Sequence, residues 1–396
     1  MNALIKQHLI DPEICIRCGT CEETCPIDAV THNDDNYVVD AEKCNYCMDC
    51  IAPCPTGSID NWRVVPAAYS LDEQFSWEEL PEQEDVGDVG SDGAMEALED
   101  EIAALLADAH SGTGGRPVAP RSASKPSVNL YNRSKPAIAT IQGNLRLTEQ
   151  GTDNDVRHIV IDMGDTVFPV LEGQSIGVVP PGVDANGKPH EVRLYSVASA
   201  RDGERPNTNN LALTVKREKS GVCSNYLCDL NRGDKVEITG PFGATFLIPD
   251  DPQAKLVMIC TGTGSAPFRA FTERRRRTMP TVSGGLTLFF GARRPEELPY
   301  FGPLKKVPPR LMTQHLVYSR LPDAPKEYVQ DRMLTCADDL AALLKDDATH
   351  VYICGLKGME EGVDKSFDTI CAQSNLDWAA LKPRMRESGR YHVETY

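Results

Sequence analysis

Two matching runs of cysteine, Cys15 to Pro26 and Cys44 to Pro55, lie near the start of this 396-residue chain. Each run reads Cys-x-x-Cys-x-x-Cys-x-x-x-Cys-Pro, a spacing of soft thiolates that suits a [4Fe-4S] cluster. A structural zinc site, the alternative, uses two cysteine pairs and leaves the fourth cysteine and the proline unexplained. In two-cluster ferredoxins the fourth cysteine of each run ligates the other cluster. The expected ligand sets are therefore Cys15, Cys18, Cys21 and Cys54 for one cluster, and Cys44, Cys47, Cys50 and Cys25 for the other.

Beyond the second run the composition becomes strongly acidic. No Lys or Arg occurs from Val64 to Gly115, and Asp and Glu accumulate there beside glycines, as is typical of a linker. A short amphipathic helix is expected within it, packed on a neighbouring domain or docking a partner, because five apolar residues recur at helical spacing: Met95, Leu98, Ile102, Leu105 and Leu106. We therefore expect an α+β cluster-binding domain at 1–67 and an acidic, flexible linker at 68–127.

Two different strand patterns follow the linker. From about Val128 to Pro249, short alternating runs such as RHIVIDM and DKVEITGPFG are separated by Gly, Pro and Asn, which predicts an antiparallel β-barrel. From Lys255 onward, apolar strands such as KLVMICT and HVYICG alternate with helical stretches, which predicts a parallel α/β sheet with a nucleotide at its strand ends. We place these two domains at 128–250 and 251–396.

Charge and hydropathy exclude several classes of function. A formal net charge of -17 argues against nucleic-acid binding, which needs a basic surface, and favours a basic docking partner. No apolar run approaches the roughly 18 residues of a membrane span, and no export signal marks the N-terminus, so a cytoplasmic location is expected. The eight His are dispersed without a helical Glu-x-x-His pair, so any oxygen chemistry belongs to a partner. The sequence leaves open whether the protein forms a homodimer.

Two glycine turns are candidate phosphate sites. Gly221 to Ser224 opens an apolar helix whose free N–H groups can bind a pyrophosphate. Thr261 to Arg269 joins an apolar strand to a helix through glycines that allow close approach of a dinucleotide. Either turn alone is a weak signal, because glycine turns between strands and helices are common.

Together these motifs resemble the plant-type ferredoxin–NADP+ reductase family, joined to a segment that resembles a bacterial-type 2[4Fe-4S] ferredoxin. The reductase resemblance covers about Val128 to Tyr396 through GQSIGVVP, NGKPHEVRLYSVAS, GVCSNYLCDL, CTGTGSAPFR, YICGLKGMEEG and YHVETY. It implies an FAD-binding β-barrel followed by an NADP(H)-binding α/β domain. It also implies that Tyr195 lies against the isoalloxazine, that Arg193 meets the phosphates, and that Val222, Cys223 and Ser224 complete the pyrophosphate site.

The same resemblance implies the remaining site residues. Those near the nicotinamide, which orient hydride transfer, are Ser196, Cys354, Glu394 and the flavin-stacking Tyr396. Those that meet the 2′-phosphate of NADPH are Ser319, Arg320, Lys326 and Tyr328, although a solvated basic patch is the alternative. The other residues expected to bind FAD or NADPH are Leu194, Thr214, Val215, Lys216, Thr263, Gly264, Ala266, Pro267, Arg293, Gln330, Gly355 and Leu356.

The expected activity is a FAD-dependent oxidoreductase that passes electrons from NADPH to FAD, to two [4Fe-4S] clusters and to an external acceptor. The order of ferredoxin first and reductase second is similar to the reductase component of benzoyl-CoA 2,3-epoxidase. That similarity implies a separate di-iron oxygenase as acceptor, in aerobic benzoate degradation. The alternatives are a ferredoxin–NADP+ reductase running toward NADPH formation, service to another oxygenase, and a non-enzymatic scaffold.

Overall fold

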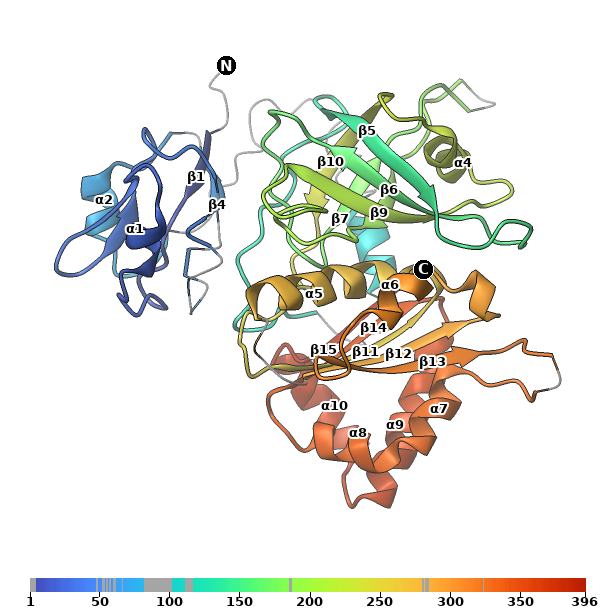
Figure 1. Ribbon diagram of the computed structural model, residues 1–396. Helices are drawn as coiled ribbons and strands as arrows, with labels where there is room; N and C mark the ends of the chain where they lie inside the picture. The colour runs from blue at the N-terminus through green and yellow to red at the C-terminus, as the bar shows by residue number, and fades with distance from the viewer. Residues whose placement is uncertain are drawn as a thin grey trace.

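Three folded modules follow one another along the chain, as the computed structural model shows (Figure 1). They are a ferredoxin-like module, an antiparallel barrel and a parallel sheet with helices. This order confirms the predicted fold class. The structure describes residues 5–47, 49–51, 54, 56, 58–59, 62–65, 67–81, 102–110, 117–184, 187–279, 281, 285–322 and 324–396.

The N-terminal module is built from two antiparallel strand pairs and two short helices. Strands β1 and β4 form one pair, and β2 and β3 form the other. A small core of Ile10, Val30, Val39 and Ile59 lies beside the cysteines. The elements are β1 (Ile5–His8), α1 (Thr20–Thr24), β2 (Val30–His32), β3 (Tyr37–Val39), β4 (Trp62–Val65) and α2 (Leu71–Phe75).

Helix α2 and its flanks pack onto this module, although their acidic sequence resembles a linker. The buried side-chain amide of Asn36 donates hydrogen bonds to the carbonyls of Phe75 and Trp77 at 3.2 and 2.7 Å. Buried Gln74 bonds both the amide and the carbonyl of Val39, like an extra strand residue. We therefore propose that the N-terminal module extends to about residue 81, beyond the boundary at 67 that composition suggests.

The second module is a six-stranded antiparallel sheet in the order β8-β7-β10-β5-β6-β9. Its edge strands meet, because Val197, just after β8, forms a bridge with Leu213 of β9, and the sheet closes into a barrel. The core includes Ile141, Ile161, Ile176 and Leu227. The elements are β5 (Ala137–Arg146), β6 (Val156–Asp162), β7 (Ser175–Val178), β8 (Arg193–Ser196), β9 (Asn210–Lys216), α4 (Val222–Asp229) and β10 (Lys235–Phe242).

The third module is a five-stranded parallel sheet in the order β13-β12-β11-β14-β15. Helices cover both faces, with α5 and α6 toward the barrel and α7 to α10 on the far side (Figure 1). The elements are β11 (Lys255–Thr261), the 3-10 turn η2 (Gly262–Gly264), α5 (Ser265–Thr278), β12 (Leu286–Ala292), the 3-10 turn η3 (Pro295–Glu297), α6 (Phe301–Lys305), β13 (Met312–Tyr318), α7 (Val329–Thr335), α8 (Ala337–Leu344), β14 (Thr349–Gly355), α9 (Met359–Gln373), α10 (Trp378–Glu387) and β15 (Tyr391–Thr395).

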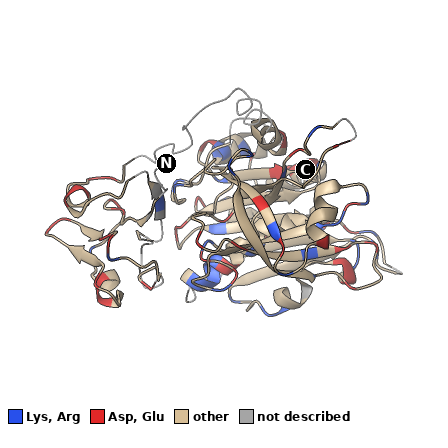
Figure 2. Cartoon of the chain, turned by 90° about the horizontal axis from the view of Figure 1, so that it is seen from above, with Lys and Arg blue, Asp and Glu red and all other residues tan. Residues whose placement is uncertain are grey.

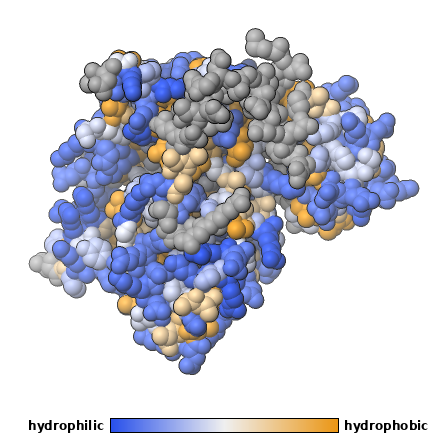
Figure 3. Space-filling model, turned by 180° about the vertical axis from the view of Figure 1, so that it is seen from behind, coloured by the Kyte–Doolittle hydropathy of each residue, from blue (hydrophilic) through white to orange (hydrophobic). Residues whose placement is uncertain are grey.

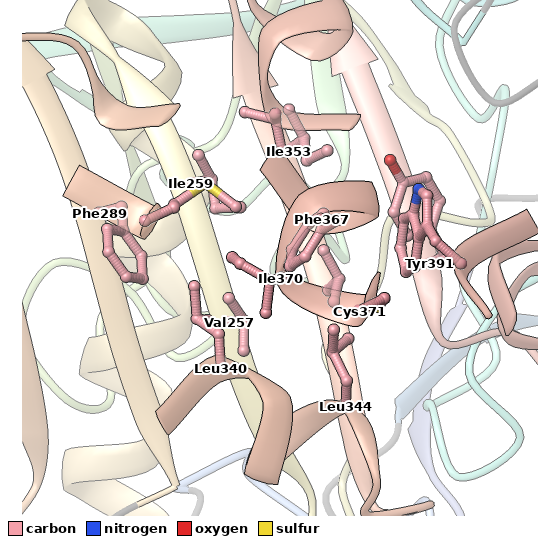
Figure 4. Packing of buried hydrophobic residues seen from close by; sticks show 14 of the residues in the cluster. Val257, Ile259, Phe289, Leu340, Leu344, Ile353, Phe367, Ile370, Cys371 and Tyr391 are labelled. Atoms are coloured by element: carbon pink, nitrogen blue, oxygen red, sulfur yellow. The ribbon is translucent and has the colours of Figure 1, made fainter. Parts of the chain in front are cut away.

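Near-continuous apolar strands explain why this sheet is covered on both faces. Strand β14 is buried along its whole length, as expected for a central parallel strand. On the far face, Ile259 and Ile353 of the sheet meet Phe367 and Ile370 of α9 (Figure 4). This core holds the carboxyl ends of β11 and β14 in place, where the predicted nucleotide turn lies.

The part of the chain between the first two modules also packs on the reductase half. Residues 102–109 are helical, as the apolar spacing predicts, and Ile102 is buried. Farther on, the Ser124 hydroxyl lies 2.6 Å from Asp250 and 2.8 Å from the Arg201 guanidinium, and both Ser124 and Arg201 are buried. Residues 117–127, which we expected to be flexible, are therefore fixed to the barrel by buried polar contacts.

Acidic residues outnumber basic ones in the N-terminal module (Figure 2). Between residues 1 and 81 the basic side chains are Lys6, Arg17, Lys43 and Arg63, against many more Asp and Glu. From behind, the molecule shows a mostly hydrophilic face with small scattered apolar areas (Figure 3). No helix in the described ranges is long and apolar enough to cross a membrane.

Candidate functional site

The eight repeat cysteines surround two separate cavities in the N-terminal module. The larger, about 330 Å³ including space open to solvent, is lined by Cys25, Cys44, Cys47 and Cys50. The smaller, about 260 Å³, is lined by Cys15, Cys18, Cys21 and Cys54. In each cavity three cysteines come from one run and the fourth from the other run. This grouping matches the crossed ligand sets expected from the sequence.

The backbone repeats itself around the two cavities. Arg17 and Tyr46, each just before the second cysteine of its run, adopt φ values of 55° and 60°. Residues other than glycine rarely take this left-handed conformation, and it persists where the surroundings require it. Both runs therefore wrap their first two cysteines with the same turn.

Without iron, the buried cysteines of the two cavities would be neutral thiols. Burial raises the pKa of Cys21 to about 11 and that of Cys50 to about 12. Such thiols would stay protonated near neutral pH, whereas iron binds and stabilises the thiolate. Hydrogen bonds reach the sulfurs as well, from the Ala29 amide to Cys25 at 3.2 Å and between Ser58 and Cys54 at 3.4 Å. Bonds of this kind adjust the reduction potential of a cluster.

On the barrel, edge strand β8 and the start of α4 form the expected flavin side of the cleft. Tyr195 is largely buried, and burial raises the pKa of its hydroxyl, which lies beside Cys223. The amides of residues 222–224 precede the first intrahelical bond, from Asn225 to Gly221, and so can receive a pyrophosphate. Arg193, the first residue of β8, is exposed and lies 3.0 Å from the Glu191 carboxylate.

The neighbouring strand β9 carries three of the expected residues. The Thr214 hydroxyl lies 2.6 Å from that of Tyr300 in the third module, whereas Val215 points to the opposite face and belongs to the barrel core. Lys216, at the strand end, is paired with Glu218 at 2.5 Å.

The four residues expected near the nicotinamide converge where the barrel meets the sheet. Ser196 Oγ lies 3.5 Å from a carboxylate oxygen of Glu394, and Glu394 pairs in register with Cys354 across β14 and β15. The Tyr396 hydroxyl lies 2.9 Å from that of Thr263, and its ring is half-exposed. Burial raises the pKa of Glu394 and of Cys354.

Glycine brings the dinucleotide turn against β14. A Cβ at Gly264 would lie 2.2 Å from the carbonyl oxygen of Cys354, so no other residue fits there without a shift. Ala266 and Pro267 open α5 directly after this turn. Gly355 and the exposed Leu356 end the adjacent strand. The turn, the helix start and the strand end thus share one edge of the sheet, as a nucleotide site requires.

Of the residues expected at the 2′-phosphate, Ser319 and Arg320 follow the carboxyl end of β13, and Lys326 and Tyr328 precede helix α7. The Arg320 amide donates to the Arg293 carbonyl at 2.8 Å, which places both guanidinium-bearing residues side by side. Arg293, Arg320 and Lys326 are exposed, and Tyr328 caps helix α7, which also carries Gln330. Ser319 follows β13 directly, and its amide donates a hydrogen bond to the carbonyl of Ala292 at 3.1 Å.

Three residues outside the expected set join the inter-module segment to the reductase half. Asp108 and His110 come from the segment between the modules, and Lys357 follows β14. No local motif marks them, because their contacts join parts of the chain far apart in sequence. The helical spacing that ends at His110 was the only available signal.

Protein-family models match the chain in three consecutive parts. A 4Fe-4S dicluster domain matches residues 7–70, an oxidoreductase FAD-binding domain matches 154–246, and an oxidoreductase NAD-binding domain matches 258–365.

Curated relatives and solved structures match the reductase part. The ferredoxin–NADP reductase of Thermosynechococcus vestitus is 40% identical over 303 residues, which cover 72% of this chain and 78% of that one. That of a Spirulina species is 38% identical, covering 68% of this chain and 98% of that one. The ferredoxin-NADP+ reductase of Plasmodium falciparum with 2′P-AMP superposes with a TM-score of 0.55 at 25% identity, covering 68% of this chain and 99% of that one.

Proposed function

We propose, from the premise that this chain belongs to the ferredoxin–NADP reductase family and carries a 4Fe-4S dicluster domain, that it conducts electrons within one polypeptide. The route runs from NADPH to FAD, to the two [4Fe-4S] clusters and then to an external acceptor. The observation that carries the proposal is the presence, in one chain, of two four-cysteine cavities and of the reductase cleft.

The residues of the cleft fit this route. Bound FAD accepts a hydride and releases electrons singly, which couples a two-electron donor to one-electron clusters. Tyr195 precedes Ser196 on β8, Tyr396 follows the end of β15, and the polar groups of Ser196 and Glu394 lie 3.5 Å apart. The eight repeat cysteines would hold the two clusters in the crossed arrangement, in which each run supplies one ligand to the cluster of the other run.

Rapid mixing with NADPH under anaerobic conditions tests this route. The flavin absorbance should fall first, and the cluster absorbance should follow at a rate independent of protein concentration, because both groups sit on one chain. A cluster phase that accelerates in proportion to protein concentration would show transfer between molecules and contradict the proposal.

The acceptor we propose is the di-iron oxygenase of benzoyl-CoA 2,3-epoxidation in benzoate degradation. The order of modules supports this choice, and the acidic N-terminal module suits a basic docking surface. Reconstitution tests it: NADPH, benzoyl-CoA and the purified oxygenase component should give epoxide only when this chain is added. If an unrelated NADPH-dependent ferredoxin reductase system gave the same amount of epoxide, the oxygenase would not be a dedicated partner of this chain.

The opposite direction is a second candidate, since the relatives are named ferredoxin–NADP reductases. In that role the clusters would receive low-potential electrons and the cleft would form NADPH. The measured potentials decide between them: clusters well below the NADP+/NADPH couple favour NADPH formation, and clusters near or above it favour the proposed route.

A further inference from the structure

The two cysteine cavities differ, although the runs that form them repeat each other. The Cys54 cavity is the one lined by Cys15, Cys18, Cys21 and Cys54. The Cys25 cavity is the one lined by Cys25, Cys44, Cys47 and Cys50. The sequence continues Pro-Ile-Asp-Ala after Cys25 and Pro-Thr-Gly-Ser after Cys54. Ile27 and Ala29 therefore line one cavity, and Thr56 and Ser58, at the equivalent positions of the repeat, line the other.

Hydroxyl groups approach the sulfurs of the Cys54 cavity. The Ser58 hydroxyl lies 3.4 Å from the Cys54 sulfur, and the Thr56 hydroxyl lies 3.8 Å from it. The Thr20 hydroxyl lies 3.3 Å from the Cys18 sulfur. A thiolate sulfur bound to iron has no hydrogen of its own and can only accept, so each hydroxyl would donate to it. These hydroxyls therefore direct hydrogen-bond donors at the ligands of one cluster.

The Cys25 cavity has a mainly apolar lining. The Ala29 amide donates to the Cys25 sulfur at 3.2 Å, but the hydrocarbon side chains of Ala29 and Ile27 cannot donate. The side-chain oxygen of Asn45 already accepts a hydrogen bond from the Cys47 amide at 3.2 Å. Besides the cysteines, the described lining residues are His8, Ile27, Ala29, Val30, Val39 and Asn45.

Hydrogen bonds to the cysteine sulfurs favour the reduced form of a cluster. Reduction adds one negative charge, which donors at the sulfurs stabilise and an apolar lining does not. The cluster of the Cys54 cavity should therefore have the higher reduction potential of the two. An electron shared between the two clusters then resides mainly in the Cys54 cavity, because electrons move toward the higher potential.

The rim of the Cys54 cavity also differs from that of the Cys25 cavity. Cys18 is exposed, and Ile14 and Ile16, on either side of Cys15 in the chain, are exposed apolar residues. The equivalent positions of the second run hold the polar residues Lys43 and Asn45. Apolar side chains thus lie beside an exposed cluster ligand at one cavity only.

Acidic side chains lie around this exposed apolar area. Arg17, within the same run, donates a hydrogen bond to the carbonyl of Asp35, which brings the turn at residues 33–36 beside the run. An apolar centre with a charged rim is the usual plan of a protein interface, and an acidic rim fits a basic partner. The exposed acidic residues of the run and the turn are Glu13, Glu23, Asp34 and Asp35.

We propose, as an extension that rests on the proposed function, that electrons leave the protein from the cluster of the Cys54 cavity. Ser58, Thr56 and Thr20 are positioning residues that act through the cysteine sulfurs and hold the potential of this cluster above that of the other. The partner is a basic one-electron acceptor protein that docks over Ile14 and Ile16. The step moves one electron from the cluster to the acceptor and forms or breaks no bond.

The first test is a redox titration of the cofactor-replete protein, in which mediators set the potential and electron paramagnetic resonance counts the reduced clusters. No NADPH is used, so the result does not depend on the proposed route. The parent should reduce its clusters in two steps. In Ser58→Ala the oxidised-to-reduced ratio of the upper step should rise about threefold at a fixed potential, a downward shift of about 30 mV at about 59 mV per tenfold. The lower step should stay in place.

The repeat supplies a reciprocal variant. Ala29→Ser places a hydroxyl at the position equivalent to Ser58 and should raise the lower step by a similar amount. Thr56→Val keeps the shape of the side chain and should lower the upper step, which gives an answer even if Ser58→Ala fails to fold. The control is Ser76→Ala, which removes a hydroxyl bonded to the Glu73 carbonyl at 2.7 Å, outside both cavity linings. A parent with a single step, or a Ser58→Ala variant that shifts the lower step or neither, would overturn the proposal.

The second test compares the same charge change beside each cavity. Glu13 and Glu42 occupy equivalent positions in the repeat, are both exposed, and bond through their amides to Asp11 and Asp40 at 3.0 Å. Protein reduced in advance with dithionite and freed of excess reductant is mixed with oxidised cytochrome c, a basic acceptor used as the probe. At low salt, Glu13→Lys should slow cytochrome reduction about threefold or more relative to Glu42→Lys, and high salt should remove the difference. Equal slowing, or a greater effect of Glu42→Lys, would contradict the assignment.

The proposed function and the exit assignment fail in different ways. If NADPH leaves the clusters of the parent protein oxidised, the proposed function fails, whereas the mediated titration and the reaction of pre-reduced protein still show which cluster is the exit. If NADPH reduces the clusters normally but Ser58→Ala keeps the parent's potentials and the two glutamate variants behave alike, only the exit assignment fails.

Discussion

At the scale of single residues, Gly264 tests how closely the dinucleotide turn must approach β14. Replacement by alanine would place a Cβ 2.2 Å from the Cys354 carbonyl oxygen, so the turn must move. We expect a loss of about 1–3 kcal/mol in stability and weaker NADPH binding, measured by thermal unfolding and titration. Gly302→Ala in α6, where nothing lies within 4 Å of a new Cβ, is the control and should be neutral or slightly stabilising.

Arg320 tests the proposed 2′-phosphate contact. Loss of a charge-assisted hydrogen bond in Arg320→Ala should cost about 1.5–3 kcal/mol, a rise of about tenfold to a hundredfold in KM for NADPH. The KM for NADH should change little, since NADH lacks that phosphate. Equal losses for both nucleotides would show that Arg320 maintains the fold instead of recognising the phosphate.

Glu204 connects the barrel to the sheet and should make stability depend on pH. Burial opposes its ionisation, but the contact with His158 at 3.2 Å and the hydrogen bonds from Arg269 outweigh this and lower its pKa to about 2. A depressed pKa means that the stabilisation is present above the ordinary value near 4.5 and is lost as pH falls toward 2. Glu204→Gln should therefore lose about 2–3 kcal/mol at pH 7, and this difference should shrink below about pH 4.5 in urea unfolding. A difference that is constant across this range would contradict the assignment.

At the scale of elements, the strands of the barrel and sheet could be predicted because their signal is local. Continuous burial in β14 follows directly from its run of apolar residues, and burial in β6 alternates apart from the adjacent buried pair His158 and Ile159. Helix α2 and residues 117–127 were missed for the opposite reason. Gln74 and Ser124 are polar residues that are buried because they bond to partners far along the chain. An acidic or Ser- and Pro-rich composition gives no sign of such partners, so it predicts a linker.

The docking of helix 102–109 can be tested by exchanging charges. Asp108→Lys places two cations together and should release the end of the helix, seen as faster amide exchange near residues 102–110. Because the pair is exposed, the cost should be at most about 1 kcal/mol. Adding Lys357→Asp should restore slow exchange. If the double variant exchanges as fast as the single one, this ion pair does not hold the helix.

At the scale of the whole molecule, the crossed cysteine sets predict pairs of equivalent variants. Cys18→Ala and Cys54→Ala should lose the same cluster, although these cysteines belong to different runs. Cys47→Ala and Cys25→Ala should lose the other cluster. Electron paramagnetic resonance spectra of the reduced variants should therefore match within each pair and differ between pairs. Spectra that group by run instead would mean that each run binds its own cluster.

The ligand pairing could be derived from spacing, whereas the position of the joining segment could not. Cys25 and Cys54 are identified by their place in a repeated pattern, so their partners follow from how two-cluster ferredoxins are built. His110 and Asp108 have no such pattern, and their contacts with Thr245 and Lys357 join parts of the chain that lie far apart in sequence.

The central claim is that one chain carries electrons from NADPH to both clusters. The most direct measurement is an anaerobic titration of the cofactor-replete protein with NADPH, following flavin absorbance and the resonance signal of reduced clusters. We expect both to change until about two equivalents are consumed, since FAD takes two electrons and each cluster takes one. Cys47→Ala should need less NADPH and lose one cluster signal. If one equivalent of NADPH reduced the flavin completely and further NADPH left both clusters oxidised, the claim would be contradicted.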